Sequence, residues 1–459
     1  MTLRLILLLS AIAGCLLLND AHRGTYDFQA FYCAGAALRE HADPYLTEPL
    51  RTCEHVRSDG TYAALPPDVA LPAPQPPYDI ALFALLSLLP FAVAKAVWGA
   101  VLGVCIAAAI AALANVTQTR VLTVFMALAA SLILPSLAFG QLFAAYAAAC
   151  ALAAFFAQRE KWAFAGIAAL FTLVEPHLGL PVCLALALWN ARARATVCTG
   201  GVLLAALCIA AAGWRESLEY AVTVLPLHAL SEINSDAQLS LAAVLHAMGF
   251  SESAALRAGA LSYLAAAAAG VVVGRLLAAR TRDAAFVVAA PAAFAVIGGT
   301  FIHSTEMVAA IPLALLLVRI APWRSRALLA LVLLSIPWFT VLHGGAPIAF
   351  AAISAAVVFY ELWQAGGLKV LQALAIAVCA GAFLAAAPAL VSHRTVRATA
   401  PMQAAYPQAS WRALTDRSLS SGAPVTWALR LPNWGGLLLL GGIAVAFAAQ
   451  RQRLFVNVN

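Results

Sequence analysis

The chain is predicted to be an all-α, polytopic membrane protein, and both its composition and its apolar pattern favour this fold class. Hydrophobic residues make up 64% of the 459 residues and charged residues only 10%, with a mean hydropathy of +0.90, whereas soluble domains carry about 25% charged residues. Apolar stretches close to the roughly 20 residues that cross a hydrocarbon core recur from Leu3 to Ala449. They lack the polar and apolar alternation of an outer-membrane barrel. Because only helices and closed barrels satisfy every backbone group in lipid, helices are expected.

The first apolar segment covers residues 3–18 and is interpreted as a membrane helix. A cleaved signal peptide is the alternative, because Ala11-Ile12-Ala13-Gly14-Cys15 resembles a lipoprotein-type cleavage box. Later apolar segments hold the chain in the membrane in either case.

A long polar loop is expected over residues 19–78. The next apolar stretch, residues 79–114, has about the length of two spans, but Pro90-Phe91 interrupts it. We interpret residues 79–90 as a short re-entrant or interfacial piece and residues 92–114 as the crossing, because two full crossings would reverse every later loop. The total is then about 12 to 14 spanning helices.

Basic residues gather in short connections, and placing all of these in the cytoplasm gives one consistent orientation. The connections are Arg120, residues 158–161, 192–194, 275–282 and 319–326, Lys369, and residues 451–453. The polar segments that then face outward are residues 19–78, 139–141, 175–177, 214–250, 302–304, 343–344 and 393–433. This arrangement predicts a multi-pass protein of the bacterial cytoplasmic membrane with its active site facing the periplasm. The formal charge of +7 is attributed to topology rather than to nucleic acid, and membrane lipids are the expected surroundings.

Nine cysteines occur without any Cys-x-x-Cys or Cys/His cluster, so no metal site and no cofactor is predicted. A divalent ion held by outer-loop acids stays open as an alternative. Cys33 and Cys53 both lie in the outer loop, where an oxidising compartment would permit a disulfide. The other cysteines sit in apolar segments and are expected to be small packing residues.

The sequence lacks the motifs of several common classes of enzyme and nucleotide-binding protein. There is no nucleotide-binding loop, no Rossmann glycine pattern, no His-Glu-x-x-His and no Gly-x-Ser-x-Gly. The sequence shows no internal repeat and no helices broken by charged residues at mid-depth, the two features that would indicate a secondary transporter.

Several outer turns, taken in order, resemble those of a known family. They are residues 27–32 (Asp-Phe-Gln-Ala-Phe-Tyr) with Ala34-Gly35, then Asp43-Pro44-Tyr45, Pro76-Pro77-Tyr78, Phe139-Gly140-Gln141, residues 175–180 (Glu-Pro-His-Leu-Gly-Leu), residues 236–241 (Asp-Ala-Gln-Leu-Ser-Leu) and the turn of residues 302–312. Their order and sidedness resemble the polyprenyl-phosphate-sugar-dependent glycosyltransferases of family 87. These enzymes belong to the GT-C superfold, and the α-mannosyltransferases of phosphatidylinositol mannoside synthesis are familiar members. The resemblance covers about the first 320 residues.

The resemblance implies a GT-C-like catalytic domain over residues 1–390, which retains the first helix, then an outer loop over 391–432 and a last membrane helix with a cytoplasmic tail over 433–459. The chain departs from the family pattern in three places. Glu175-Pro176 stands where Lys-Pro is common, and Asp236 stands where Asn is usual. The late turn lacks the family's Ser-Pro and paired aromatic or His residues, which leaves His303 and Glu306 as approximate counterparts.

By this resemblance the chain is a hexosyltransferase that uses a polyprenyl-phosphate sugar, with mannose the sugar of the familiar members, and a lipid or glycan acceptor. A lipid-phosphate sugar carries a good leaving group, so transfer needs mainly a base on the acceptor hydroxyl and support for the departing phosphate. Asp27 is the predicted general base, and attack from the opposite face of the sugar predicts inversion. Without the family pattern, a lone Asp in a loop is normally a solvated charge or a helix cap.

Ten further residues are predicted to bind donor or acceptor: Tyr26, Gln29, Tyr32, Tyr78, Gln141, Glu175, His177, Gln238, His303 and Glu306. Gln141 is alternatively part of a turn at a helix stop. Glu175 and His177 are equally well interpreted as a mutual structural pair. His303 is alternatively an interfacial histidine satisfied by a carbonyl, with Glu306 as its structural neighbour.

The last outer loop combines arginines with aromatic residues: His393, Arg394, Arg397, Arg412, Arg417 and Arg430 beside Tyr406, Trp411, Trp427 and Trp434. An interfacial belt is the main interpretation, and binding of lipid phosphate is the alternative. Two other functions stay open for the whole chain. One is a transporter or flippase of a lipid-linked glycan, and the other is a catalytically inactive scaffold for envelope assembly.

Overall fold

The computed structural model describes residues 26–57, 69–235, 237–320, 323–335, 354–360, 405–415 and 424–450. In these segments every regular element is a helix, and the only extended pairing is an isolated bridge between Gln238 and His303. The predicted all-α class is therefore confirmed for this part of the chain. The predicted first helix, residues 3–18, lies outside it.

Four of the described helices are long and apolar enough to cross a membrane. They are α5 (Phe91–Thr117), α11 (Ala191–Ala212), α15 (Glu252–Thr281) and the part of α22 (Pro424–Ala449) that begins at Arg430. Many of their large apolar side chains are exposed, such as Val104 and Val202, each 70% accessible. Such surfaces are unfavourable in water and suit contact with lipid, which agrees with a membrane protein.

Shorter helices fill the space between these four. They are α6 (Val121–Leu128), α7 (Leu134–Phe139), α8 (Phe143–Gln158), α9 (Trp162–Phe171), α10 (Pro176–Trp189), α16 (Phe286–Ala295), η5 (Ser304–Ala310), α17 (Ile311–Val318) and α18 (Arg324–Ser335). Alanine and glycine let them approach closely, as at α16, where every residue is buried.

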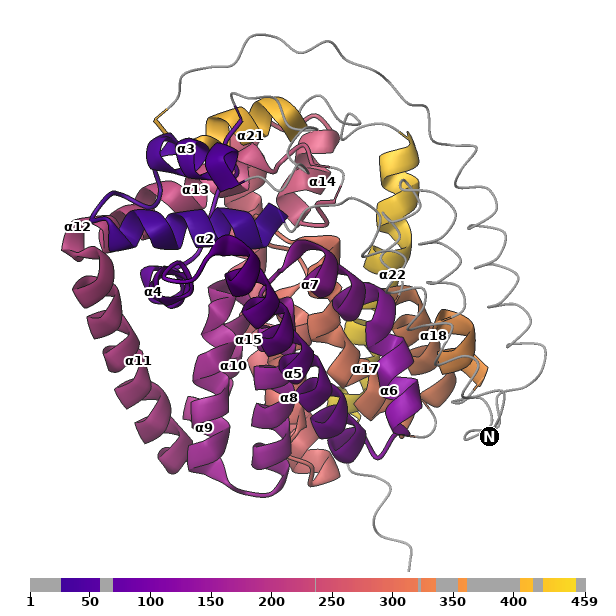
Figure 1. Ribbon diagram of the computed structural model, residues 1–459. Coiled ribbons are helices and arrows are strands. Elements are labelled where there is room, and N and C mark those ends of the chain that lie inside the picture. The colour runs from indigo at the N-terminus through magenta and orange to yellow at the C-terminus, as the bar shows by residue number, and fades with distance from the viewer. Residues whose placement is uncertain are drawn as a thin grey trace, which may run out of the picture.

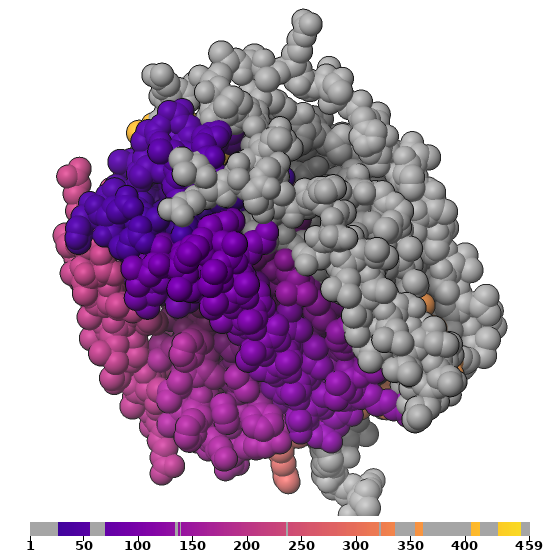
Figure 2. Space-filling view, viewed as in Figure 1, coloured from indigo at the N-terminus to yellow at the C-terminus, as the bar shows by residue number. Residues whose placement is uncertain are grey.

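A cap of mostly short helices lies at one end of the long helices (Figure 1). It contains α2 (Tyr26–Arg39), α3 (Thr47–Arg57), α12 (Trp214–Glu219), α13 (Leu225–Ser231), α14 (Leu241–Ala247) and α21 (Pro407–Thr415). In the space-filling view the indigo residues of α2 and α3 lie against the purple residues that follow them in the chain (Figure 2). The described parts of three predicted outer segments, 19–78, 214–250 and 393–433, thus lie together at one end of the long helices.

The predicted loop over residues 19–78 is largely helical where it is described, and this corrects the sequence interpretation. Ten residues of α2 are buried, because the helix packs on α4 (Pro77–Leu86). Gly35 permits this approach, since a Cβ there would lie 2.3 Å from the carbonyl carbon of Phe83. The interruption at Pro90 is confirmed: α4 is a separate short helix, and Pro90 is the N-cap of α5.

Before α4 lies a proline-rich segment without regular secondary structure, residues 69–76, which we call the strap. The buried Glu54 holds it by accepting a hydrogen bond from the Leu71 N–H at 3.0 Å, and the Tyr45 hydroxyl donates to the Gln75 carbonyl at 2.9 Å. Ser410 of α21 hydrogen-bonds both the N–H and the carbonyl of Ala70. The strap is therefore fixed on both sides.

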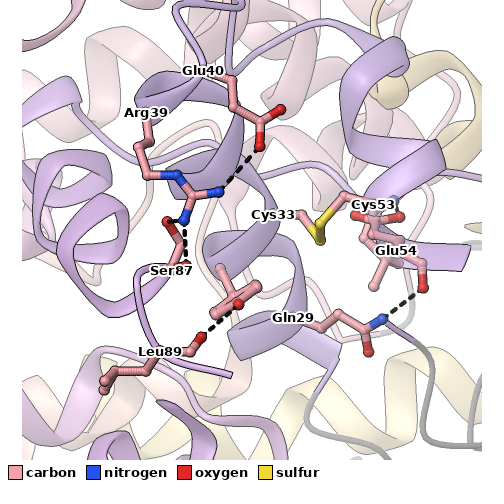
Figure 3. The surroundings of a disulfide bond; sticks show 10 residues. Gln29, Cys33, Arg39, Glu40, Cys53, Glu54, Ser87 and Leu89 are labelled. Carbon is pink, nitrogen blue, oxygen red and sulfur yellow. Dashed lines mark hydrogen bonds and ion pairs between the residues drawn. A yellow bond between two sulfur atoms is a disulfide. The ribbon is translucent and has the colours of Figure 1, made fainter. Parts of the chain in front are cut away.

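A disulfide joins Cys33 of α2 to Cys53 of α3, which confirms that the outer-loop cysteines can meet (Figure 3). Beside it, the Gln29 amide donates to the Glu54 carbonyl at 2.8 Å. Burial raises the pKa of Glu54 to about 8, although the Leu71 N–H lowers it. The disulfide thus ties α2 to the helix that holds the strap.

Replacing both cysteines, as in C33S/C53S, is expected to lower the free energy of unfolding by about 3 kcal/mol, the loop-closure value for a cross-link over some 20 residues. Thermal unfolding in detergent, with and without a reductant, measures this. The wild-type protein should lose the same stability on reduction, and the double variant should not respond to the reductant. Equal stability of the wild type in both conditions would contradict the prediction.

At the other end of the chain, α22 begins at Pro424, earlier than the predicted start at residue 433, and it includes Pro432. Pro424 supplies a suitable first residue, because the first turn of a helix does not need its N–H. The predicted outer loop over 391–432 thus contains α21 and the first turns of α22. Its residues 391–404 and 416–423 lie outside the described part.

Candidate functional site

A pocket of about 270 Å³ opens in the cap, and segments far apart in the sequence form its wall. Asp27 and Phe31 of α2 contribute to it, together with the strap and the start of α8. The turn before α10, residues 220–232, residues 300–303 and Trp411 complete the wall. Among the predicted site residues, Asp27, Gln141, Glu175, His177 and His303 line this pocket.

Asp27 lies in the first turn of α2, where a helix terminus favours a negative charge. Its side chain is partly buried in the pocket wall and hydrogen-bonds the side-chain amide of Gln141. Burial raises the pKa of Asp27 to about 6, against the opposing effects of the Gln141 hydrogen bond and the charge of His303. Near neutral pH this carboxyl group can therefore accept a proton and release it again.

The turn at Gly140 brings Gln141 to Asp27. Helix α7 ends in a left-handed residue, Gly140, with φ of +77°. The Trp98 indole donates to the Gly140 carbonyl at 2.8 Å, and a Cβ on Gly140 would lie 2.6 Å from the Cβ of Phe28. A glycine is thus required both for the conformation and for the contact with α2. The Oε1 atom of Gln141 is buried without a hydrogen-bond partner, so an acceptor remains available beside Asp27.

His303 and Glu232 form the first of two histidine–carboxylate pairs. The His303 Nε2 lies 3.4 Å from a carboxylate oxygen of Glu232, whose other oxygen accepts a hydrogen bond from the Trp411 indole. Burial by itself raises the pKa of Glu232, but the His303 and Trp411 contacts bring it down to about 2. Burial by itself lowers the pKa of His303, yet Glu232 raises it above the usual 6.5. Because the ionised carboxylate is only an acceptor, the His303 Nε2 carries the proton.

His177 and Glu306 form the second pair, with 2.7 Å between Nε2 and Oε2. Glu306 is fully buried and uses its other oxygen to accept from the His303 N–H at 3.0 Å. The backbone carbonyl of His177 accepts from the Tyr263 hydroxyl at 2.7 Å. Glu306 therefore connects the two histidines, and it is a positioning residue rather than part of the pocket wall. The predicted neighbour relation between His303 and Glu306 is confirmed.

A third histidine completes the polar wall. The rings of His228 and His303 each lie 4.5 Å from the Phe301 ring, and His177 lies 6.2 Å from it, measured between centroids. Burial lowers the pKa of His228 to about 4, so this imidazole is neutral at pH 7. The sequence also allowed a structural pair between Glu175 and His177. In the structure the side-chain partner of His177 is Glu306 instead.

Besides Glu306, five predicted binding residues lie outside the pocket wall and have structural contacts instead. Tyr26 packs against the hydrophobic core, Gln29 binds the Glu54 carbonyl, and the hydroxyls of Tyr32 and Tyr78 donate to the carbonyls of Leu89 and Leu173. Gln238 is fully buried and accepts from the Ile302 N–H at 3.0 Å. Asp236 lies outside the described residues.

Several residues that line the pocket were not predicted as site residues from the sequence, among them His228, Glu232, Tyr220, Phe301 and Trp411. His228 and Glu232 are four residues apart, so a helix would place them on one face. That spacing was a usable signal. Trp411 gave no signal beyond a membrane belt, because only tertiary packing brings α21 to Glu232.

Within the described segments, no group of three or more His, Cys, Asp or Glu side chains has a metal-binding arrangement. Comparison with protein-family models, with curated proteins and with solved structures gave no match.

Proposed function

We propose that this protein is a GT-C-like membrane glycosyltransferase, with about 12 to 14 spanning helices, that transfers a hexose from a polyprenyl phosphate to a lipid or glycan acceptor. The observation that carries the proposal is the Asp27 carboxyl group in a pocket that also presents two histidine–carboxylate pairs. In the reaction, the acceptor hydroxyl oxygen forms a bond to the anomeric carbon as its proton passes to Asp27. The bond from that carbon to the phosphate oxygen breaks, and the polyprenyl phosphate leaves with the electron pair.

Asp27 suits the role of general base, because a pKa of about 6 leaves it mostly ionised at neutral pH yet basic enough to take a proton. A carboxylate with a lower pKa would hold a proton less well. A fully buried one with a higher pKa would be protonated before the reaction.

The departing phosphate needs positive or dipolar support, and histidines are the groups available for it. Among the described residues that line the pocket, no Lys or Arg occurs, whereas His177, His228 and His303 do. Each of the paired histidines keeps a buried carboxylate behind it, which favours a proton on the ring. We infer that His303 and His177 face the phosphate side of the donor.

The remaining wall suits a sugar ring. Tyr220, Phe301 and Trp411 supply aromatic surface, and Glu175 and the free Oε1 of Gln141 supply hydrogen-bond acceptors for hydroxyl groups. The cavity of about 270 Å³ is near the lower end of ligand sites, about 300–1000 Å³. The Cys33–Cys53 disulfide supports the proposal that the cap faces an oxidising periplasm, outside the cytoplasmic membrane.

The test is to incubate the purified protein with polyprenyl-phosphate mannose labelled in the sugar and with membrane lipid extracts as acceptors. The proposal expects label in a product that no longer carries the phosphate. A flippase in sealed vesicles would move the intact labelled lipid across the bilayer without breaking the bond, and a scaffold would do neither. Either of those results would overturn the proposal.

Removing the hydrogen bond from Gln141 is expected to move the pH dependence of transfer. Transfer requires ionised Asp27, so the rate should fall as the pH drops through about 6. The Gln141 hydrogen bond favours the charged form, so in Gln141→Leu the pKa of Asp27 rises and the acid limb shifts to higher pH. The measurement is kcat/KM against pH for both proteins. An acid limb that stays in place would remove Gln141 from this role, and Gln118→Leu, at an exposed turn, serves as the control.

A further inference from the structure

Arg430 is the largest side chain that is fully buried in the described residues, with 1% of its surface exposed. The sequence pattern predicts an interfacial position for it, but its guanidinium points into the protein from α22. Its Nε donates to the Gln238 carbonyl at 2.7 Å and an Nη donates to the Ser235 carbonyl at 3.0 Å. Burying an arginine is costly, so its donors are expected to hold their acceptors firmly.

The backbone that Arg430 binds is paired directly with the residues around His303. The Leu239 N–H donates to the Ile302 carbonyl at 2.7 Å, and the Ser304 N–H donates to the Ala237 carbonyl at 3.0 Å. The Gln238 side chain also accepts from the Ile302 N–H. Residues on both sides of His303 are thus hydrogen-bonded to the segment that Arg430 fixes.

From this arrangement we propose that Arg430 is a positioning residue: it fixes the backbone at Ser235 and Gln238 and thereby aims the His303 imidazole at Glu232 and the pocket. The planar guanidinium imposes both the spacing and the direction of the Ser235 and Gln238 carbonyls that accept from it, which an ammonium group cannot do. Glu306 links the position of His303 to that of His177, because it accepts from the His303 N–H and contacts the His177 ring. One arginine from the last membrane helix therefore sets the positions of two histidines of the site.

The inference rests on the proposed function for its kinetic consequence, but it has a readout of its own. If the backbone at Ser235 and Gln238 shifts, His303 loses its contact with Glu232, and burial then lowers the pKa of His303. The groups that act on His303 are Glu232 and His228 at α13, Glu306 of η5, Asp27 of α2 and His177 of α10. A change at Arg430 leaves these groups in place, and the loss of its positive charge would by itself raise the pKa of His303. A fall in that pKa therefore reports a change in the position of His303.

The experiment compares Arg430→Met and Arg430→Lys with the wild type in nanodiscs. Histidine ¹³C labelling gives ring titration curves, and His303→Gln assigns the His303 signal by its loss. We expect the His303 titration to move to lower pH in Arg430→Met and less so in Arg430→Lys, with kcat for transfer reduced about tenfold or more and KM changed little. In a protein that already carries His303→Gln, adding Arg430→Met should lower kcat little further, because both substitutions act through His303.

Arg280→Met is the matched control. Arg280 also donates to backbone carbonyls, those of Phe447 in α22 and of Gln450 just after it, but it lies outside the pocket wall. An Arg280 variant that shifts the His303 titration as much as Arg430→Met would overturn the proposal, and so would an unchanged titration in Arg430→Met. Should Arg430→Met not fold, Arg430→Lys and Gln238→Met test the same step. If the wild type shows no transfer, the proposed function fails, while the titration still decides the role of Arg430.

Discussion

Asp27→Asn is expected to lower the rate of sugar transfer by about 100- to 10,000-fold, the usual contribution of a general base. The amide keeps the size of the side chain and can still hydrogen-bond Gln141, but it cannot accept the acceptor's proton. The KM for the polyprenyl-phosphate sugar should change little, because the phosphate is assigned to the histidines across the pocket. Initial rates with labelled donor, over a range of donor concentrations, measure both quantities.

The control is Glu40→Gln, which removes an exposed carboxylate just after the same helix and should leave transfer unchanged. Asp27→Asn should also unfold within a few degrees of the wild type, since a charge at a helix N-terminus contributes only about 0.3–1 kcal/mol and burial of Asp27 opposes that charge. A folded Asp27→Asn protein that transfers sugar at the wild-type rate would remove Asp27 from the mechanism.

Gly140→Ala is expected to abolish most activity and to destabilise the cap. The new Cβ would lie 2.6 Å from the Cβ of Phe28, and the left-handed backbone at φ +77° is strained for alanine. Strain of this kind costs about 1–3 kcal/mol, and relief of the contact must move the turn away from α2. Gln141 would then separate from Asp27, so the residual activity should show an acid limb at higher pH. Thermal unfolding and the pH profile of kcat/KM test the two effects separately.

Gly103→Ala provides the matched control, because Gly103 lies in the middle of α5, where an added Cβ would meet nothing within 4 Å. Alanine there should be neutral or slightly stabilising, since glycine inside a helix costs about 0.5–1 kcal/mol. Equal stability and equal activity in the two alanine variants would contradict the argument that Gly140 sets the position of Gln141.

The helical membrane class was predictable because it depends on composition and segment length, which are properties of the sequence itself. The short helix before Pro90 was predictable for the same reason, since proline interrupts a long apolar stretch locally. The helices α2 and α3 were missed because their stability comes from contacts far along the chain. Gly35 packs on Phe83, and the Cys33–Cys53 bond joins the two helices.

The candidate site likewise contains residues that the local sequence could indicate and residues that only distant contacts bring in. Asp27, Gln141, Glu175, His177 and His303 were selected as polar residues in outer turns, and the fold brings them into one pocket. Sequence order could not separate these from Gln29 or Tyr32, whose polar atoms face backbone carbonyls within the protein. Glu232, Trp411 and Arg430 act through partners that are 60 or more positions away, as with Glu232 and His303, so no local pattern could have identified them.

The pocket unites residues from near both ends of the chain, Asp27 on α2 and Trp411 on α21. During synthesis Asp27 is therefore made long before Trp411, whose indole completes the pocket wall. A nascent chain that ends before α21 carries an incomplete pocket, and long-range contacts of this kind are slow to form. Synthesis would thus delay completion of the pocket until α21 has been made and has packed against α13.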